Sequence, residues 1–283
     1  MKNVPSARVA VVIPSFNRRA ITEATVQALA EDGYDPKTIF ICDSGSTDGT
    51  REAVSRYPGV EVLNVGSDQW WSGAVNAGVR TALARAFEYV LVLNDDIIFQ
   101  PRLIASLVEQ AQQHGRAIIC AAQRDVQGRL FYGNRVVGWR RRRKLVEITG
   151  REPAEIHVMN GCCQLIPIEV FRQIGLFNVA QCPHLAGDIE FQLRASRAGY
   201  RLFVCPAIVI DQSAPTDLRS RYRLRTLLTA PNSPYRPGIH WAVGKQIYGS
   251  HWKLALMGAE YHLRYALGVI KAAAIAVFRN RKW

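Results

Sequence analysis

Residues 9–14 read VAVVIP, residues 38–43 read TIFICD and residues 89–94 read YVLVLN, and amphipathic helical patterns separate these apolar runs. Each run is short, rich in β-branched residues and free of charge before its last position. Such runs are typical of buried strands, and their alternation with helices is typical of a mostly parallel sheet covered on both faces. These stretches therefore predict an α/β fold.

The same alternation extends to residue 122 and then gives way to loops and further helices. Strands are expected at Val9–Pro14, Thr38–Asp43, Val60–Val65, Tyr89–Asn94 and Ala117–Ala122, and helices at Ala20–Glu31, after Asp48, at Gly73–Phe87 and at Pro101–His114. Residues 123–155 contain the basic run Trp139–Lys144 and predict hairpins and exposed loops. An apolar segment (Ile156–Pro167), a helix from about Ile168 and a helix from Gly187 to about Gly199 follow, and the composition changes near Ala214–Pro215.

Polar clusters follow three of the predicted strands. They are SFNR at residues 15–18, DSGSTDGT at residues 43–50 and NDD at residues 94–96. Each alone is also explained by turn and helix-capping chemistry, for which Asp, Ser, Asn and Gly are the usual residues. Because ligands bind beyond the carboxyl ends of strands in open α/β sheets, three such clusters at one edge predict a binding site there.

The carboxylates in these clusters indicate what that site binds. Asp43 can accept the imide N–H of uracil or thymine, or the N1–H and N2–H of guanine, which favours a UDP, dTDP or GDP group. Asp95 and Asp96 follow a buried strand and suit Mg²⁺ or Mn²⁺, whose remaining ligands would be phosphate oxygens and water. An Asx turn is the alternative for that pair, and Asp48 is expected to be structural, at the start of a helix.

In order and spacing, residues 12–18, 43–50 and 93–96 resemble the successive signatures of family 2 glycosyltransferases. The resemblance covers about residues 9–211 and implies the GT-A fold, a Rossmann-like, mostly parallel central sheet with flanking helices. It implies a catalytic domain over residues 1–214, with a nucleotide-binding half (about 1–122) and an acceptor-binding half (about 123–214). Residues 215–283 are expected to form a basic, amphipathic helical extension.

The resemblance also implies roles for individual residues. Asp96 would be the principal metal ligand, and Asn94 stands where the family often has the first Asp of its Asp-x-Asp signature. The donor-binding residues expected in these motifs are Pro14, Phe16, Asn17, Asp43, Asn94 and Asp95.

Residues 69–78 are similar to the family's asparagine-glycine segment, in the version found in bacterial rhamnosyltransferase-like members. A helix that starts there with small residues suits a diphosphate. Asn76 is expected to face the donor, and Trp71 is expected near the sugar, although Trp70 and Trp71 are equally explained as core aromatics.

Residues 185–194 resemble the family's acidic motif, in which a carboxylate at a helix start deprotonates the acceptor hydroxyl. Gly187 stands where many members carry Glu, so Asp188 is the expected base, its ionised form favoured by the helix dipole. An ordinary helix N-cap is the alternative for Asp188, and Glu190 is expected to hold the acceptor. Many members complete the metal site with a later His, where this chain offers Asp211 or, less well placed, His184; the alternative is Asp96 with the diphosphate alone.

Composition indicates which binding partners and which cellular compartment to expect. The net charge is +13, and residues 219–283 hold twelve Lys or Arg residues against one acid, Glu260. The six cysteines have no metal-binding or redox spacing and are expected to be reduced core thiols of a cytoplasmic protein. Neither a signal peptide nor a spanning helix is expected. The basic run Trp139–Lys144 is expected to be solvated, or to attract a phosphorylated acceptor.

The C-terminal extension carries an apolar stripe at helical spacing beside a basic stripe. The apolar residues are Leu256, Leu263, Leu267, Ile270, Ala274 and Val277; the basic ones are Lys253, Arg264, Lys271 and Lys282; Trp252, Tyr261, Tyr265 and Trp283 add aromatic rings. This pattern fits a helix on the anionic inner face of the cytoplasmic membrane, or one packed on the catalytic domain or on a second subunit of a homo-oligomer.

The sequence thus favours a metal-dependent transfer of a sugar from a nucleotide-sugar donor to a hydroxyl of a bacterial glycan or lipid-linked acceptor, and the resemblance implies inversion at the anomeric carbon. A nucleotidyltransferase is the nearest alternative, although the loop at residues 15–18 lacks the glycines that grip a triphosphate. A basic nucleic-acid-binding protein is the other alternative, but no nucleic-acid motif accompanies the charge, and no nucleic-acid partner is expected.

Overall fold

The computed structural model describes residues 8–115, 117–124, 127–128, 130–131, 133–137, 142–145, 150–212 and 226–280. The strands are β1 (Val9–Ser15), β2 (Ile39–Asp43), β3 (Glu61–Asn64), β4 (Tyr89–Leu93), β5 (Ile97–Phe99), β6 (Ile118–Arg124), β7 (Leu130–Phe131), β8 (Asn134–Val137), β9 (Arg142–Leu145), β10 (Ala154–Ile156), β11 (Cys163–Pro167) and β12 (Leu202–Gln212). The helices are α1 (Arg19–Glu31), η1 (Pro36–Thr38), α2 (Thr50–Val54), α3 (Trp70–Leu83), α4 (Leu103–Gln113), α5 (Ile168–Ile174), α6 (Gly187–Arg197), α7 (Pro237–Tyr248), α8 (His251–Met257) and α9 (Ala259–Asn280).

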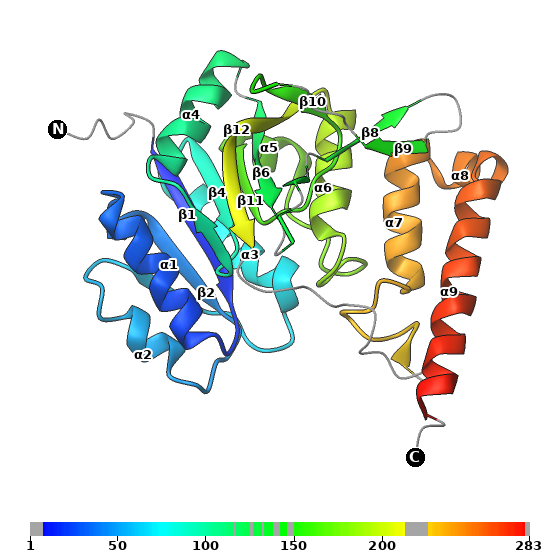
Figure 1. The fold of residues 1–283 in the computed structure, drawn as a ribbon, viewed down its shortest axis with the longest axis horizontal. Coiled ribbons are helices and arrows are strands. Elements are labelled where there is room, and N and C mark those ends of the chain that lie inside the picture. Colours follow the sequence, from blue (N-terminus) through cyan, green and yellow to red (C-terminus); the bar gives the residue numbers. More distant parts are fainter. Residues whose placement is uncertain are drawn as a thin grey trace.

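One large sheet forms the centre of the α/β part of the molecule, in the order β10-β12-β6-β11-β4-β1-β2-β3 (Figure 1). The four strands β3, β2, β1 and β4 are parallel, and β6 is parallel to β12. Strand β11 lies between β4 and β6 and runs antiparallel to both. The predicted α/β fold with parallel strands is therefore confirmed, and β11 joins the two groups of parallel strands into one sheet.

Alternation of side chains along β1 creates two apolar layers. Val9, Val11 and Ile13 face a core shared with α1 and α4, whereas Ala10 and Val12 face a core shared with α3, α5 and α6. A strand buried on both faces is continuously apolar, which is why β1 is recognisable in the sequence.

The sheet register brings the predicted polar clusters to one edge. Ser15 at the end of β1 pairs with Asp43 at the end of β2, and Val12 pairs with Val92 near the end of β4. The loops after β1, β2 and β4 therefore emerge side by side, as the sequence predicted.

Helices α7, α8 and α9 lie at the opposite end of the molecule from α1 and α2 (Figure 1). A third apolar cluster, which includes Leu193 of α6, Val243 of α7 and Leu254 of α8, attaches them to the catalytic domain. The predicted helical extension is present from residue 237 onward. The predicted boundary at Ala214–Pro215, most of the basic run at residues 139–144, Lys282 and Trp283 fall outside the residues or side chains described.

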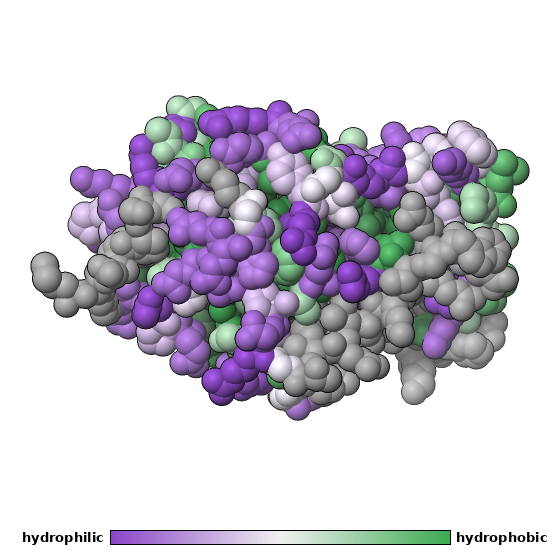
Figure 2. Space-filling view, turned by 90° about the horizontal axis from the view of Figure 1, so that it is seen from above, coloured by the Kyte–Doolittle hydropathy of each residue, from purple (hydrophilic) through white to green (hydrophobic). Residues whose placement is uncertain are grey.

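The exposed face of the extension is apolar. Along residues 256–277 the predicted apolar stripe is exposed, with Leu263 at 59%, Leu267 at 55% and Ile270 at 63%. Figure 2 shows apolar residues gathered at the end of the molecule that carries these helices, whereas the rest of that view is mostly hydrophilic. Among the described residues, no helix has the length and apolarity needed to cross a bilayer.

The inner face of α9 is aromatic. Tyr261 donates a hydrogen bond to the His240 carbonyl at 3.0 Å, and Tyr265 donates to the Tyr235 carbonyl at 2.8 Å. These two tyrosines were predicted as interfacial aromatics, but they pack against α7 and its preceding loop. Trp252 alone of the three described aromatics is strongly exposed, at 62%.

Candidate active site

Asp95 is fixed at the carboxyl end of β4 by helix α1. Its Oδ1 accepts a hydrogen bond from Arg18 at 2.9 Å and its Oδ2 from Thr22 at 3.0 Å, while Thr25 donates to its backbone carbonyl at 2.8 Å. The side chain is 4% exposed. Burial raises the pKa of Asp95, and the positive charge of Arg18 opposes the rise.

Asp96 is the more accessible of the two carboxylates, with 13% of its side chain exposed. Its Oδ2 lies 3.0 Å from Nη1 of Arg18, so one guanidinium bridges both acids. Among the described residues, no group of three or more His, Cys, Asp or Glu is arranged to hold a metal ion. One or two carboxylates at a strand end do fit Mg²⁺ or Mn²⁺, which take their remaining ligands from phosphate and water.

Asp43 lies fully buried at the end of β2. Its Oδ1 accepts from the Ser46 N–H at 3.1 Å, and its Oδ2 pairs with Arg51 at 3.3 Å. Asn17 closes the same loop, because its N–H donates to Ser46 at 2.8 Å and its Oδ1 accepts from the Thr47 N–H at 2.8 Å. The loop thus has a fixed shape beside Asp43.

Around that loop, Phe16 is 51% exposed and Pro14 is half-buried, so both are accessible to a ligand at this edge. Asp48 accepts hydrogen bonds from the N–H groups of Thr50 and Arg19, which is the structural role expected for it at the start of α2.

Trp71 reaches the loop after β4 from α3. Its indole N–H donates to Oδ1 of Asn94 at 3.0 Å, and its ring meets Phe177 edge-on at 5.4 Å. The ring of Trp71 therefore packs in the core, and its indole N–H fixes the side chain of Asn94, next to Asp95. Asn76 is different: its amide donates to and accepts from the backbone of Phe177, both at 2.9 Å, and it is buried. These contacts give Asn76 a structural role between α3 and the loop before α6, and its donor contact stays a prediction.

Asp188 is the second residue of α6, and the N-cap is Ala186. The carboxylate accepts from the Gly161 N–H at 2.7 Å and from the Ile189 N–H at 2.8 Å. A Cβ on Gly161 would lie 2.8 Å from the Asp188 Cβ, so only glycine allows this approach.

The pKa of Asp188 departs from the sequence expectation. Loss of hydration raises it, and the two N–H bonds to the carboxylate only oppose the rise. The expectation that the helix terminus favours the ionised form is therefore reversed by burial. Gly161 and Cys162 connect this acid to the loop after β4, because Gly161 donates to Asp188 and the Cys162 carbonyl accepts from the N–H of Asn94 at 2.8 Å. Burial, followed by the charges of Asp96 and Asp188, raises the pKa of the Cys162 thiol.

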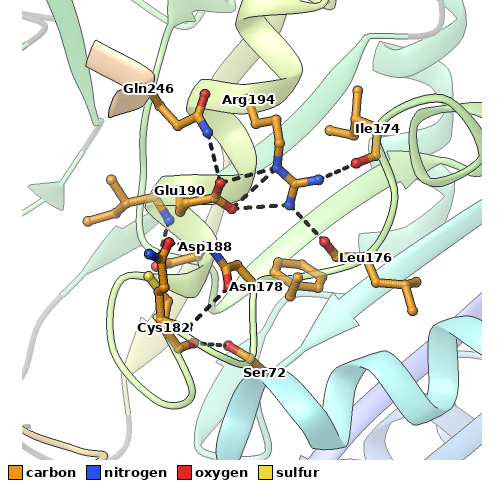
Figure 3. Close-up of polar contacts among 12 residues, drawn as sticks. Ser72, Ile174, Leu176, Asn178, Cys182, Asp188, Glu190, Arg194 and Gln246 are labelled. Atoms are coloured by element: carbon orange, nitrogen blue, oxygen red, sulfur yellow. Dashed lines mark hydrogen bonds and ion pairs between the residues drawn. The ribbon is translucent and has the colours of Figure 1, made fainter. Parts of the chain in front are cut away.

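Glu190 points to the other side of α6 (Figure 3). It is 3% exposed and forms an ion pair with Arg194 at 3.1 Å, and Gln246 of α7 donates to it at 3.0 Å. Arg194 in turn donates to the carbonyls of Ile174 and Leu176. Glu190 thus ties α5, α6 and α7 together and lines a cavity of about 360 Å³ beside Lys245.

Gly187, in place of the family's usual Glu, makes room for a clamp between α3 and the loop before α6. Ser72 donates from Oγ to the Cys182 carbonyl at 2.6 Å and from its N–H to the Pro183 carbonyl at 2.8 Å (Figure 3). A Cβ at Gly187 would lie 2.3 Å from Oγ of Ser72. The packing around Ser72 therefore leaves no room for a side chain at position 187, and glycine is required there.

The two candidates for a further metal ligand differ in their surroundings. Asp211 pairs across the sheet with Ile98, two residues after Asp96, but its carboxylate contacts Arg124 at 3.5 Å. His184 packs edge-on against Trp70 at 5.4 Å, and its Nδ1 is buried without a hydrogen-bond partner. Burial, followed by the charge of Arg18, lowers the pKa of His184.

Backbone strain gathers around the same edge. Of the four non-glycine residues with positive φ among those described, three are Asn17, Trp70 and Ala186, which precede α1, begin α3 and precede α6. Such conformations cost about 1–3 kcal/mol each and persist where surrounding contacts hold them. The sequence did not indicate them, nor did it assign roles to Arg18, Thr22 or Gly161.

Comparison with known proteins identifies the family. The model described as Glycosyl transferase family 2 matches residues 10–175, which excludes Asp188. A Mycobacterium tuberculosis protein named N-acetylglucosaminyl-diphospho-decaprenol L-rhamnosyltransferase is 26% identical over 208 residues, 63% of this chain and 67% of its own. The Micrococcus luteus undecaprenyl-phosphate mannosyltransferase is 25% identical over 147 residues, 50% of this chain and 57% of its own.

Solved structures support the fold. A crystal structure of GalNAc-T7 with UDP, GalNAc and Mn²⁺ superposes with a TM-score of 0.63 at 14% identity, over 85% of this chain and 47% of that one. The mannosyltransferase PcManGT from Pyrobaculum calidifontis, in complex with GDP-Man and Mn²⁺, gives a TM-score of 0.56 at 17% identity, over 99% of this chain and 90% of that one. The family match spans more than half of the chain, and the chain therefore belongs to glycosyltransferase family 2, with the GT-A fold.

Proposed function

We propose that the chain transfers a sugar from a UDP-, dTDP- or GDP-sugar to a hydroxyl of a bacterial glycan or lipid-linked acceptor, with inversion at the anomeric carbon. The observation that carries the proposal is the position of Asp188: Gly161 donates to its carboxylate, and the carbonyl of the next residue, Cys162, accepts from the N–H of Asn94, which precedes Asp95 and Asp96. A carboxylate of raised pKa beside a nucleotide edge suits general-base catalysis.

The donor would lie across the loops after β1, β2 and β4. Asp43 takes the base edge once Arg51 gives up its contact, Pro14, Phe16 and Asn17 border the nucleotide, and Asn94, Asp95 and Trp71 lie toward the ribose and the sugar. Asp96 holds a divalent cation together with the diphosphate. When bound, Mg²⁺ or Mn²⁺ supplies positive charge that stabilises the departing nucleoside diphosphate. Asp211 lies on β12, outside the three loops, and is left out of this set.

In the transfer step the acceptor oxygen forms a bond to the anomeric carbon while the bond from that carbon to the diphosphate oxygen breaks. The electron pair leaves with the diphosphate, and the acceptor proton passes to Asp188. Glu190 acts on the acceptor side indirectly, because its contacts with Arg194 and Gln246 hold α6 and α7 around the cavity beside them.

The lipid-linked acceptor is favoured by two observations. Relatives in the comparisons are named for decaprenol and undecaprenyl-phosphate substrates. The exposed apolar stripe of α9 also lies beside basic residues such as Arg264, whose side chain is 72% exposed. An amphipathic helix of this kind binds anionic bilayers, which would place the protein peripherally on the inner face of the cytoplasmic membrane.

The decisive experiment compares Asp188→Asn with Glu190→Gln in a sugar-transfer assay, after the donor has been chosen by thermal shift with and without Mn²⁺. Asp188→Asn keeps the shape but cannot take the proton, so turnover should fall by about 10²–10⁴-fold with donor affinity close to wild type. Glu190→Gln should lower stability more than turnover. Normal turnover of Asp188→Asn together with an inactive Glu190→Gln would reassign the base.

A further inference from the structure

Arg18 bridges the two carboxylates on which the proposed cation site depends. Its Nη1 lies 2.9 Å from Oδ1 of Asp95 and 3.0 Å from Oδ2 of Asp96. A guanidinium is always charged, so it neutralises much of the charge of the pair. None of the roles assigned above uses Arg18, although it contacts the carboxylate that would hold the divalent cation.

The two contacts of Arg18 are not equivalent. Thr22 also donates to the Asp95 carboxylate and Thr25 to the Asp95 backbone carbonyl, so both groups of Asp95 keep a partner without Arg18. Asp96 is the more exposed partner, at 13% against 4% for Asp95. The contact with Asp96 is therefore the one that can open while the end of β4 keeps its shape.

Arg18 itself is able to move. Its side chain is 43% exposed and extends from the residue that precedes α1, next to the strained backbone of Asn17. A divalent cation and a guanidinium at the same carboxylate oxygen repel each other. A diphosphate brings new negative charge to the same place, and its oxygens match the planar donor fork of arginine.

We propose that Arg18 is a resident counter-cation that occupies the Asp95–Asp96 pair before the donor arrives and exchanges Asp96 for the diphosphate when the cation and donor bind. This inference rests on the proposed function. It gives Arg18 two opposite effects: it competes with the cation alone, and it supports the complex of cation and diphosphate. A purely structural Arg18 would favour both.

The test measures two affinities for the full chain and its Arg18→Ala variant. Free Mn²⁺ is counted by electron paramagnetic resonance without nucleotide, and binding of inorganic pyrophosphate in saturating Mn²⁺ is measured by calorimetry. Loss of a partly exposed competing ion pair should tighten Mn²⁺ alone by about two- to fivefold. Loss of a charge-assisted contact should weaken pyrophosphate by about tenfold or more.

Two further variants sharpen the result. Arg18→Lys keeps the charge without the fork, so Mn²⁺ alone should bind as in wild type while pyrophosphate binding falls between the other two. Arg201→Ala removes one positive charge from a surface ion pair with Glu155 and should change neither affinity. Circular dichroism checks that each variant is folded.

Opposite shifts in the two affinities of Arg18→Ala support the exchange. Weaker Mn²⁺ binding, or unchanged pyrophosphate binding, overturns it even when UDP, dTDP or GDP binds the wild type normally. Failure of the wild type to bind any of these nucleotides in Mn²⁺ would instead overturn the proposed function, so the two failures are distinguishable.

Discussion

Asp96 and Asp211 were both predicted to bind the metal, and their positions now separate them. Each carboxylate contacts an arginine, so the difference lies in their positions: Asp96 directly follows Asp95 at the end of β4, whereas Asp211 lies on β12, paired with Ile98. Asp96→Ala should weaken binding of the nucleoside diphosphate in Mn²⁺ by about tenfold or more, because a charged ligand is lost. Asp211→Asn, the matched control, should leave that affinity unchanged. Calorimetry measures the affinity of both variants for the nucleoside diphosphate, and an equal loss of affinity in the two would assign Asp211 to the metal site.

Gly187 provides a test of the clamp around Ser72. Alanine is favoured over glycine in a helix by about 1 kcal/mol, but less so in the first turn, where Gly187 lies. The Cβ that alanine adds would overlap Oγ of Ser72, which should cost about 1–3 kcal/mol. Gly187→Ala should therefore lower the free energy of unfolding. Adding Ser72→Ala should restore part of the loss. Denaturant unfolding of the single and double variants measures this, and a stabilised single variant would contradict the packing described.

Residues whose partners are close in sequence were the ones that the sequence predicted best. Asp48 contacts Thr50, and its role at the start of α2 followed from local pattern. The contact of Asn76 with Phe177 was not predicted, because Phe177 lies 101 positions away and no local pattern reveals it. The roles of Arg18 and Gly161 escaped for the same reason: each acts on a carboxylate brought to it by the fold.

At the level of elements, α9 is held to α7 by a histidine pair. Nε2 of His240 lies 2.9 Å from Nδ1 of His262, and His240 stacks on Tyr261 and Tyr265 at 4.5 and 4.1 Å. Burial, followed by the nearby His262, lowers the pKa of His240 from 6.5 to about 4. A neutral imidazole is therefore part of this packing.

The sign of the resulting pH effect follows from proton uptake. Between pH 6.5 and about 4 the unfolded chain protonates His240 and the folded chain does not, so stability should fall as the pH drops through this window. His240→Gln should flatten the dependence, whereas His251→Gln, on the exposed start of α8, should keep it. Thermal unfolding from pH 7.5 to 4.5 measures the difference. An identical slope in wild type and His240→Gln would rule the pair out.

The C-terminal helices show how far periodicity can predict an element. The apolar stripe was identified correctly, and its residues lie in helices, yet periodicity could not say which face would be buried. The buried face of α9 is the aromatic one, because the hydroxyls of Tyr261 and Tyr265 donate hydrogen bonds to α7 and to the loop before it. Leu263 and Leu267 are exposed.

At the scale of the whole molecule, that exposed stripe predicts membrane binding. The full chain should co-sediment with anionic liposomes, more weakly at high salt, and deletion after Ser250 should abolish the binding. Replacement of Leu263 and Leu267 by Gln should weaken it while keeping the charge. Neutral liposomes serve as the control. If the full chain ignores anionic liposomes and sediments as a dimer, the stripe belongs to a second subunit.

Strand β11 has a consequence for exchanging parts between related enzymes. It comes from residues 163–167, yet it lies between β4 and β6, both from the first 124 residues. A fragment that ends at residue 124 would therefore lack β11 and present β4 with an unpaired, apolar edge, which is a template for aggregation. When a new acceptor specificity is grafted onto this protein, the graft should therefore keep the chain's own β11 and replace only the segments around it, because β11 completes the sheet between β4 and β6.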